Sequence, residues 1–161
     1  MTWRDNAMDA ATLAGRVLLA TLFLHEAWSK LTGYELALAY MTAYGVPGLL
    51  LPFAIAVEIG CGLLILIGYQ TRIAALALAG FCLATALLFH TKLGDRNQLL
   101  HFEKDLAIAG GLLVLFAHGA GGFALDALHK RNRSSRGASA RPSPLVGRRT
   151  PSADGLPRHF H

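Results

Sequence analysis

Ionisable side chains lie inside long apolar stretches of this sequence. Residues 22–31 carry His25, Glu26 and Lys30 within an otherwise apolar block, and Glu58 is the one charge of a second block. Charges inside membrane-length segments are costly, so they commonly mark a ligand, proton or ion site. Glu58 must therefore be protonated, paired or turned toward a wet interior. A carboxylate and a lysine at such depth could exchange a proton with a ligand or bind its polar group.

The phase of a helix groups some of these residues. At 100° per residue, Arg16, Glu26 and Lys30 fall within one narrow arc of a helix. Glu26 and Lys30 also form an i, i+4 pair in the favourable order. His25 points away from this face, and we interpret it as a bystander.

The elements that must position these groups are helices in a membrane. The 161 residues are 53% hydrophobic and 16% charged, with a mean hydropathy of +0.42, which disfavours a soluble globular protein. Four apolar blocks approach the ~20 residues that a spanning helix needs. They are Leu13–Leu31, Leu49–Tyr69, Ile73–Phe89 and Phe102–Ala117. The fold class predicted is all-α, a membrane four-helix bundle.

Charge distribution predicts the topology. We divide the chain into an N-terminal cytoplasmic segment (1–12), a four-transmembrane-helix domain (13–128) and a basic tail (129–161). The tail holds eight Lys and Arg residues against one acid. Because positive residues concentrate on the cytoplasmic side, both termini are predicted to be cytoplasmic. No cleaved signal peptide is expected, since the first block lacks a basic region before it and a cleavage site after it.

The tail itself is predicted to be disordered. It is rich in Ser, Arg, Pro and Gly and has no apolar period, so it cannot bury enough surface to offset the entropy of ordering. It could contact anionic lipid, although a solvated tail that only sets topology explains the same composition. Nucleic acid is not an expected partner.

Given this topology, five ionisable residues fall at mid-depth or in the outer half of the membrane. We predict that they share an interior polar site: Glu26, Lys30, Glu58, Lys104 and Asp105. His90 and His101 fall in the same half. The alternative for the histidines and Lys30 is a position at the membrane interface, and for Glu58 it is a hydrogen bond that only packs helices.

Other chemistries find no support in the sequence. A di-iron carboxylate site would need Glu-x-x-His repeats, and none occurs, so no metal is predicted. Cys61 and Cys82 are too far apart for a Cys-x-x-Cys motif. They could be two small buried residues, or a disulfide between neighbouring helices. No phosphate loop, nucleophile triad or dinucleotide fingerprint is present.

A series of short motifs follows along the chain. They are Arg16, Ser29-Lys30-Leu31, Tyr44-Gly45-Val46-Pro47, Glu58 with Gly62 and Gly68, Thr71-Arg72, Phe102-x-Lys104, Gly110-Gly111 and Leu125-Asp126. In this order they resemble the DoxX family of small four-helix bacterial membrane proteins. The resemblance covers about Leu13–Asp126 and implies a location in the bacterial plasma (inner) membrane. The chain departs from the family pattern at His25-Glu26 and at Asp105.

The resemblance also implies a redox association. Some relatives act in quinone-linked oxidation, including the small subunit of a thiosulfate to quinone oxidoreductase, and others in membrane complexes against oxidative stress. The first functional hypothesis is thus a subunit or accessory of a quinone-linked membrane oxidoreductase system. Lys30, Glu58 and Lys104 would then line a site for a quinone or a small anion.

Two further hypotheses stay open, a non-catalytic membrane assembly or anchoring protein and a small transporter. Expected partners are the lipid bilayer and redox partner proteins. Homo-oligomerisation is left open. The sequence does not decide whether the chain is an enzyme.

Overall fold

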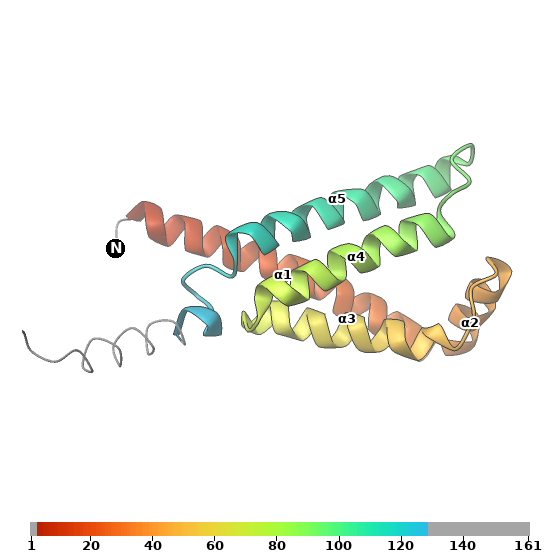
Figure 1. The fold of residues 1–161 in the computed structure, drawn as a ribbon, viewed down its shortest axis with the longest axis horizontal. Coiled ribbons are helices and arrows are strands. Elements are labelled where there is room, and N and C mark those ends of the chain that lie inside the picture. The colour runs from red at the N-terminus through yellow and green to blue at the C-terminus, as the bar shows by residue number, and fades with distance from the viewer. Residues whose placement is uncertain (1–2, 129–161) are drawn as a thin grey trace, which may run out of the picture.

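The computed structural model describes residues 3–128, and the predicted disordered tail at 129–161 lies outside this range. All the regular structure of the described part is helical. Its five helices are α1 (Trp3–Thr32), α2 (Tyr34–Ala43), α3 (Leu50–Ile67), α4 (Thr71–Phe89) and α5 (Arg96–His118) (Figure 1). Within these residues, α1, α3 and α4 are long and apolar enough to cross a membrane. The predicted all-α membrane fold is confirmed.

Helix α2 lies between the first two predicted apolar blocks, in a segment for which the sequence predicted no spanning helix. Residues 34–43 form a ten-residue helix because Ala, Leu, Glu and Met are strong helix formers. Gly33 separates α2 from α1, and Pro47 follows it. At about 1.5 Å per residue, ten residues reach only about half of a bilayer core. Helix α2 therefore lies beside the spanning helices without crossing.

The ends of α1 and α5 also differ from the predicted blocks. Helix α1 begins at Trp3, so most of the predicted N-terminal segment continues the first helix. Helix α5 begins at Arg96, because the Asp95 side chain accepts a hydrogen bond from the Asn97 backbone N–H at 2.8 Å and caps the helix. Three charged residues interrupt the apolar character of α5: Glu103, Lys104 and Asp105. Helix α5 is not among the helices that are long and apolar enough to cross a membrane.

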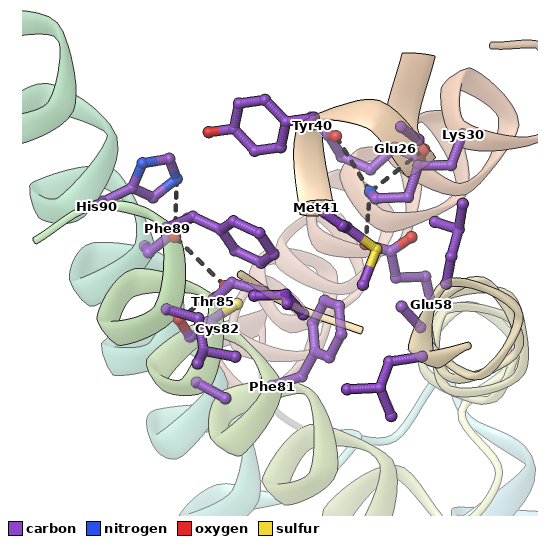
Figure 2. Close-up of a pocket in the computed structure, with 18 of the residues that line it drawn as sticks. Glu26, Lys30, Tyr40, Met41, Glu58, Phe81, Cys82, Thr85, Phe89 and His90 are labelled. Atoms are coloured by element: carbon purple, nitrogen blue, oxygen red, sulfur yellow. Dashed lines mark hydrogen bonds and ion pairs between the residues drawn. The ribbon is translucent and has the colours of Figure 1, made fainter. Parts of the chain in front are cut away.

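The helices form two antiparallel pairs. Helix α1 packs along α3, α4 packs along α5, and the contact between α3 and α4 joins the pairs (Figure 1). At one end lie the α3–α4 turn (68–70) and residues 119–128, which we call the closed end. At the other end lie α2 and the α4–α5 loop (90–95), which we call the open end. The pairs diverge toward the open end, where a cavity lies between them (Figure 2).

Arg16 of α1 holds the closed end together. It is only 1% exposed. Its guanidinium donates hydrogen bonds to the backbone carbonyls of Ala120 at 2.9 Å, Phe123 at 3.0 Å and Leu66 at 3.5 Å. A buried cation must be paired or fully hydrogen-bonded. The segment after α5 is consequently fastened to α1 and α3.

Two aspartates add to this closure. The Asp126 carboxylate accepts hydrogen bonds from the backbone N–H groups of Gln70 at 2.9 Å and Thr71 at 3.1 Å. These donors belong to the first turn of α4, where helical partners are missing. Asp9 of α1 accepts a hydrogen bond from the Gly122 N–H at 2.7 Å. Residues 119–128 are thereby tied to α1 and to the start of α4.

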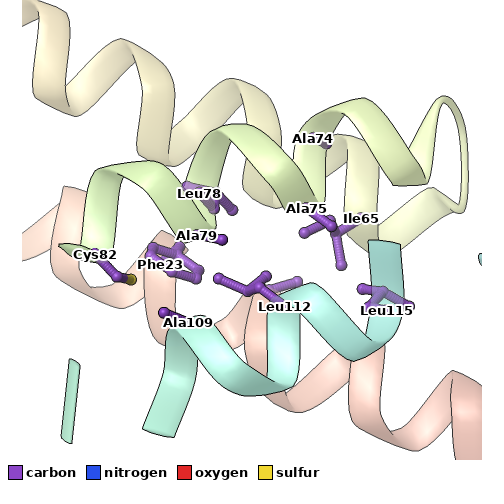
Figure 3. Close-up of a cluster of buried hydrophobic side chains, with 11 residues drawn as sticks. Phe23, Ile65, Ala74, Ala75, Leu78, Ala79, Cys82, Ala109, Leu112 and Leu115 are labelled. Atoms are coloured by element: carbon purple, nitrogen blue, oxygen red, sulfur yellow. The ribbon is translucent and has the colours of Figure 1, made fainter. Parts of the chain in front are cut away.

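Small residues allow α4 and α5 to approach closely in the apolar core (Figure 3). The four long helices all supply large side chains to it: Phe23 from α1, Ile65 from α3, Leu78 from α4, and Leu112 and Leu115 from α5. Around them lie the small residues Ala74, Ala75, Ala79, Cys82 and Ala109, all buried. Small side chains let helix backbones pack tightly inside a membrane. Both cysteines are free thiols, so no disulfide joins α3 to α4.

The closed end predicts unequal effects of two glycine substitutions in the α3 region. Gly68 has φ +72°, and an added Cβ would meet Ala124 and the Arg16 guanidinium. Gly68→Ala should cost about 1–3 kcal/mol from backbone strain alone. That cost corresponds to a melting temperature about 4–10 °C lower, measured by circular dichroism in detergent micelles.

Gly60→Ala is the matched control, because a Cβ at this position of α3 meets nothing within 4 Å. Alanine favours a helix over glycine by about 1 kcal/mol, so this variant should melt at or above the wild-type temperature. Equal melting temperatures for the two variants would contradict the packing of the closed end.

Candidate ligand-binding cavity

A cavity of about 570 Å³ opens between the two helix pairs at the open end (Figure 2). All five helices line it. Much of its wall is apolar or aromatic, with Met41, Phe81 and Phe89 around its middle. Its size and lining match those of small-molecule sites, which combine an apolar wall with a few placed polar groups.

The cavity brings together residues that are far apart in the sequence. All five members of the predicted polar site line it: Glu26, Lys30, Glu58, Lys104 and Asp105. Lys104 remains largely exposed, whereas Glu58 is 2% exposed. His25, which helical phase directs away from the site, is exposed on α1 and does not line the cavity.

One polar group of the cavity consists of Glu26, Lys30 and Glu58, which we call the lysine wall. The Lys30 Nζ donates a hydrogen bond to the Glu58 Oε1 at 2.9 Å and lies 3.4 Å from the Glu26 Oε2. Glu26 and Lys30 face α3 because they follow the buried stripe of α1 that includes Arg16 and Phe23. A single lysine therefore bridges carboxylates on two helices.

The second oxygen of Glu58 has a different environment. Among the described residues, its Oε2 atom is buried and has no hydrogen-bond partner. The side chain lines the cavity and is only 3% exposed. A buried carboxylate oxygen without a donor is costly, because it has lost water and gained nothing in return. A proton on this oxygen or a donor from a bound ligand would satisfy it.

The other polar group consists of Thr85, His90, His101 and Asp105, which we call the histidine wall. The Asp105 Oδ2 accepts a hydrogen bond from the Thr85 hydroxyl at 3.4 Å and lies 3.9 Å from the His90 Nε2. The rings of His90 and His101 stack with their centroids 5.1 Å apart. These residues come from α4, α5 and the turn after α4.

Neighbouring side chains fix the orientation of His90. Its Nδ1 lies 2.9 Å from the Gln98 Oε1, and the Gln98 amide donates a hydrogen bond to the Tyr44 hydroxyl at 2.7 Å. The Nε2 is left to face Asp105. This chain of contacts links the loop after α2 with the start of α5.

Aromatic rings cover the cavity near α2. The Tyr40 ring stacks on Phe89 with centroids 5.5 Å apart and lies 4.9 Å from the Tyr44 ring. Partial burial, and secondly the Tyr44 hydroxyl, raise the pKa of Tyr40 to about 12. The Tyr40 hydroxyl consequently keeps its proton at neutral pH and can donate a hydrogen bond.

Sequence reasoning did not select the whole site. Thr85 and Tyr40 line the cavity, yet nothing in their local sequence marks them. His90 and His101 were candidates for either the interior or the interface, and both line the cavity. Within residues 3–128, no group of three or more His, Cys, Asp or Glu side chains could hold a metal ion.

Comparisons with known proteins place this chain among small membrane proteins. A family model described as DoxX matches residues 11–91. The chain is 45% identical to "Inner membrane protein YqjF" of Escherichia coli (strain K12), over 74% of this chain and 92% of the relative. It is 31% identical to "Inner membrane protein YphA" of the same organism, over 74% and 91%. No solved structure matches the chain.

The lysine wall predicts an energetic coupling between Lys30 and Glu58. Removing one partner of a buried ion pair leaves the other charge uncompensated, which costs up to about 3–5 kcal/mol. Because the Lys30 side chain is 26% exposed, Lys30→Met should cost less, about 1–3 kcal/mol. The loss should fall by at least half in a Glu58→Gln background, where no carboxylate remains at that position.

A double-mutant cycle measures this coupling from chemical unfolding in mixed micelles. Lys92→Met, in the exposed α4–α5 loop, is the control and should change stability little in either background. Additive effects of Lys30→Met and Glu58→Gln would contradict the pairing.

Proposed function

This chain is an integral, multi-pass inner membrane protein of the DoxX family, and from that premise we propose that it is a subunit or accessory of a quinone-linked membrane oxidoreductase system. The cavity between the helix pairs binds the quinone in its reduced form, the quinol, whose hydroxyl can donate a hydrogen bond to a carboxylate oxygen. The observation that carries the proposal is the buried Glu58 Oε2 without a partner in the wall of an apolar cavity. Such an oxygen is suited to a ligand that brings its own hydrogen-bond donor.

The shape and lining of the cavity support a ring ligand. A volume of about 570 Å³ accommodates a substituted aromatic ring together with part of its tail. Phe81, Phe89 and Tyr40 offer flat apolar faces for stacking. Because the cavity lies among helices that span the membrane, a lipid-soluble molecule can reach it from the bilayer.

The lysine wall supplies the polar chemistry. The Lys30 ammonium donates a hydrogen bond to a quinone carbonyl, and Glu58 takes a proton from a quinol hydroxyl or returns it. Lys104 adds positive charge on the opposite side of the cavity. A partner redox protein exchanges the electrons, so the chain itself contributes binding and proton transfer.

A non-catalytic assembly or anchoring protein is the second candidate. It is favoured by the closed end, where Arg16 and Asp126 make only contacts with backbone groups. Those polar residues fix packing and do not line the cavity between the helix pairs. This role would require no ligand at Glu58, and the binding experiment below separates the two functions.

Quinone binding is expected to depend on Glu58 and Lys104. Purified protein in lipid nanodiscs should bind a tritiated short-chain hydroquinone saturably under anaerobic conditions. Glu58→Gln and Lys104→Ala should each weaken binding about tenfold, which corresponds to one hydrogen bond or close charge. Equilibrium binding is measured alongside circular dichroism, so that loss of the folded protein is not mistaken for loss of affinity.

The matched controls are Glu103→Gln and Lys92→Ala, because neither residue lines the cavity and both are exposed. Both should bind as wild type does. If Glu58→Gln and Lys104→Ala also bind as wild type does while folded, the anchoring role is favoured instead.

We also propose that both termini lie in the cytoplasm. Support comes from the eight basic residues after position 128 against one acid. Residues 9 and 16 contact the segment after α5, which agrees with an even number of membrane passes.

Paired reporter fusions test this orientation. A green fluorescent protein fused after residue 130 should fluoresce, and alkaline phosphatase at the same point should be inactive. Inserted after Gly94, in the α4–α5 loop, the two reporters should give the reverse result. Active phosphatase after residue 130 would overturn the proposed orientation.

A further inference from the structure

The two polar walls lie on opposite sides of the cavity. Figure 2 shows Lys30 and Glu58 on one side, Thr85 and His90 on the other, and the Phe81, Phe89 and Met41 side chains between them. Each wall combines a carboxylate with a nitrogen: Glu58 with the Lys30 Nζ at 2.9 Å, and Asp105 with the His90 Nε2 at 3.9 Å. Because the neutral His90 ring donates its Nδ1 proton to the Gln98 Oε1, its Nε2 is an acceptor, so the histidine wall offers acceptors to a ligand hydroxyl. The cavity thus has two separate hydrogen-bonding ends and an apolar middle.

The two walls belong to different helix pairs. The lysine wall lies on α1 and α3, while the histidine wall comes from α4, α5 and the turn between them. The pairs touch mainly through α3 and α4. Within residues 3–128, no hydrogen bond or ion pair joins the lysine wall to the histidine wall, so a molecule in the cavity would make the link.

Charge balance restricts the kind of molecule. The ionisable groups that face the cavity are three carboxylates, Glu26, Glu58 and Asp105, two ammonium groups, Lys30 and Lys104, and the imidazoles His90 and His101. With neutral imidazoles, the carboxylates outnumber the cations by one. A small anion would have to displace a carboxylate from the Lys30 ammonium. The Glu58 carboxylate would then face the anion without a compensating cation. Both changes are unfavourable in a low-dielectric site.

Resting on the proposed function, we propose that the ligand is a neutral ring with two opposed hydroxyl groups, the hydroquinone form of a 1,4-quinone. One oxygen binds at the lysine wall, where a hydroxyl donates to the Glu58 Oε2. The other binds at the histidine wall between His90 and Asp105. His90 is accordingly a binding residue for the second oxygen, and a ligand with one polar end, or an inorganic anion, leaves this wall unused.

A matched pair of ligands tests whether the histidine wall binds the second oxygen. An alkyl hydroquinone and the alkyl phenol that lacks one hydroxyl are used, under anaerobic conditions, to displace the tritiated short-chain hydroquinone from nanodiscs. The wild type should bind the hydroquinone about tenfold more tightly than the phenol, as one further hydrogen bond to an ionisable group implies. Sulfate and thiosulfate at millimolar concentrations should displace nothing.

Two variants remove the histidine wall without touching the lysine wall. His90→Leu and Asp105→Leu should each reduce the preference for the hydroquinone to about twofold or less, while affinity for the phenol stays near wild type. If one variant fails to fold, the other still decides. His25→Leu is the control, because His25 is exposed on α1, and it should keep the tenfold preference.

The outcomes separate this inference from the proposed function. If the wild type binds the tritiated hydroquinone but shows no preference, or if folded His90→Leu and Asp105→Leu both keep the preference, the histidine wall does not bind the second oxygen, while binding of the reduced quinone in the cavity stands. Displacement of the tritiated probe by sulfate or thiosulfate would contradict the inference that the ligand is neutral. Absence of any saturable binding overturns the proposed function and this inference together.

Discussion

Every ionisable group within these membrane helices must be satisfied by the protein itself, and this constraint organises the structure. Arg16 meets it through three backbone carbonyls. Lys30 meets it through two carboxylates. Glu58 meets it with only one of its two oxygens. The contacts of Arg16 and Lys30 stabilise the fold. The second oxygen of Glu58 lies in the cavity wall without a hydrogen-bond donor, and a ligand can supply that donor.

The two ends of the molecule use polar residues in opposite ways. At the closed end, Arg16 donates to backbone carbonyls, Asp126 accepts from the backbone N–H groups at the start of α4, and the helices meet. Only the Arg16 Nε and the Thr71 hydroxyl are buried there without a partner among the described residues. At the open end, the helix pairs diverge and leave polar groups on both sides of a gap of about 570 Å³. Tight closure at one end fixes the relative position of the pairs, so the cavity at the other end has a defined shape without being filled by side chains.

Membership of the DoxX family bears unequally on the two walls. The matched region, residues 11–91, includes all of the lysine wall and also Thr85 and His90. His101, Lys104 and Asp105 lie on α5, beyond it. The part of the cavity that the family model covers is thus α1, α2, α3 and the facing side of α4. Similarity to the YqjF relative runs over 120 residues and therefore extends past residue 91.

What the sequence determined was local: the apolar blocks, the all-α class, and the common face of Arg16, Glu26 and Lys30, because helical periodicity assigns side chains to faces. It also directed His25 away from the site. Tertiary structure decided the rest. The carbonyl partners of Arg16 lie 50 to 107 residues away, and Thr85 and His90 meet Asp105 only because α4 packs along α5. Periodicity tells which face of a helix is turned inward, but side-chain packing between helices determines which faces meet and where they part.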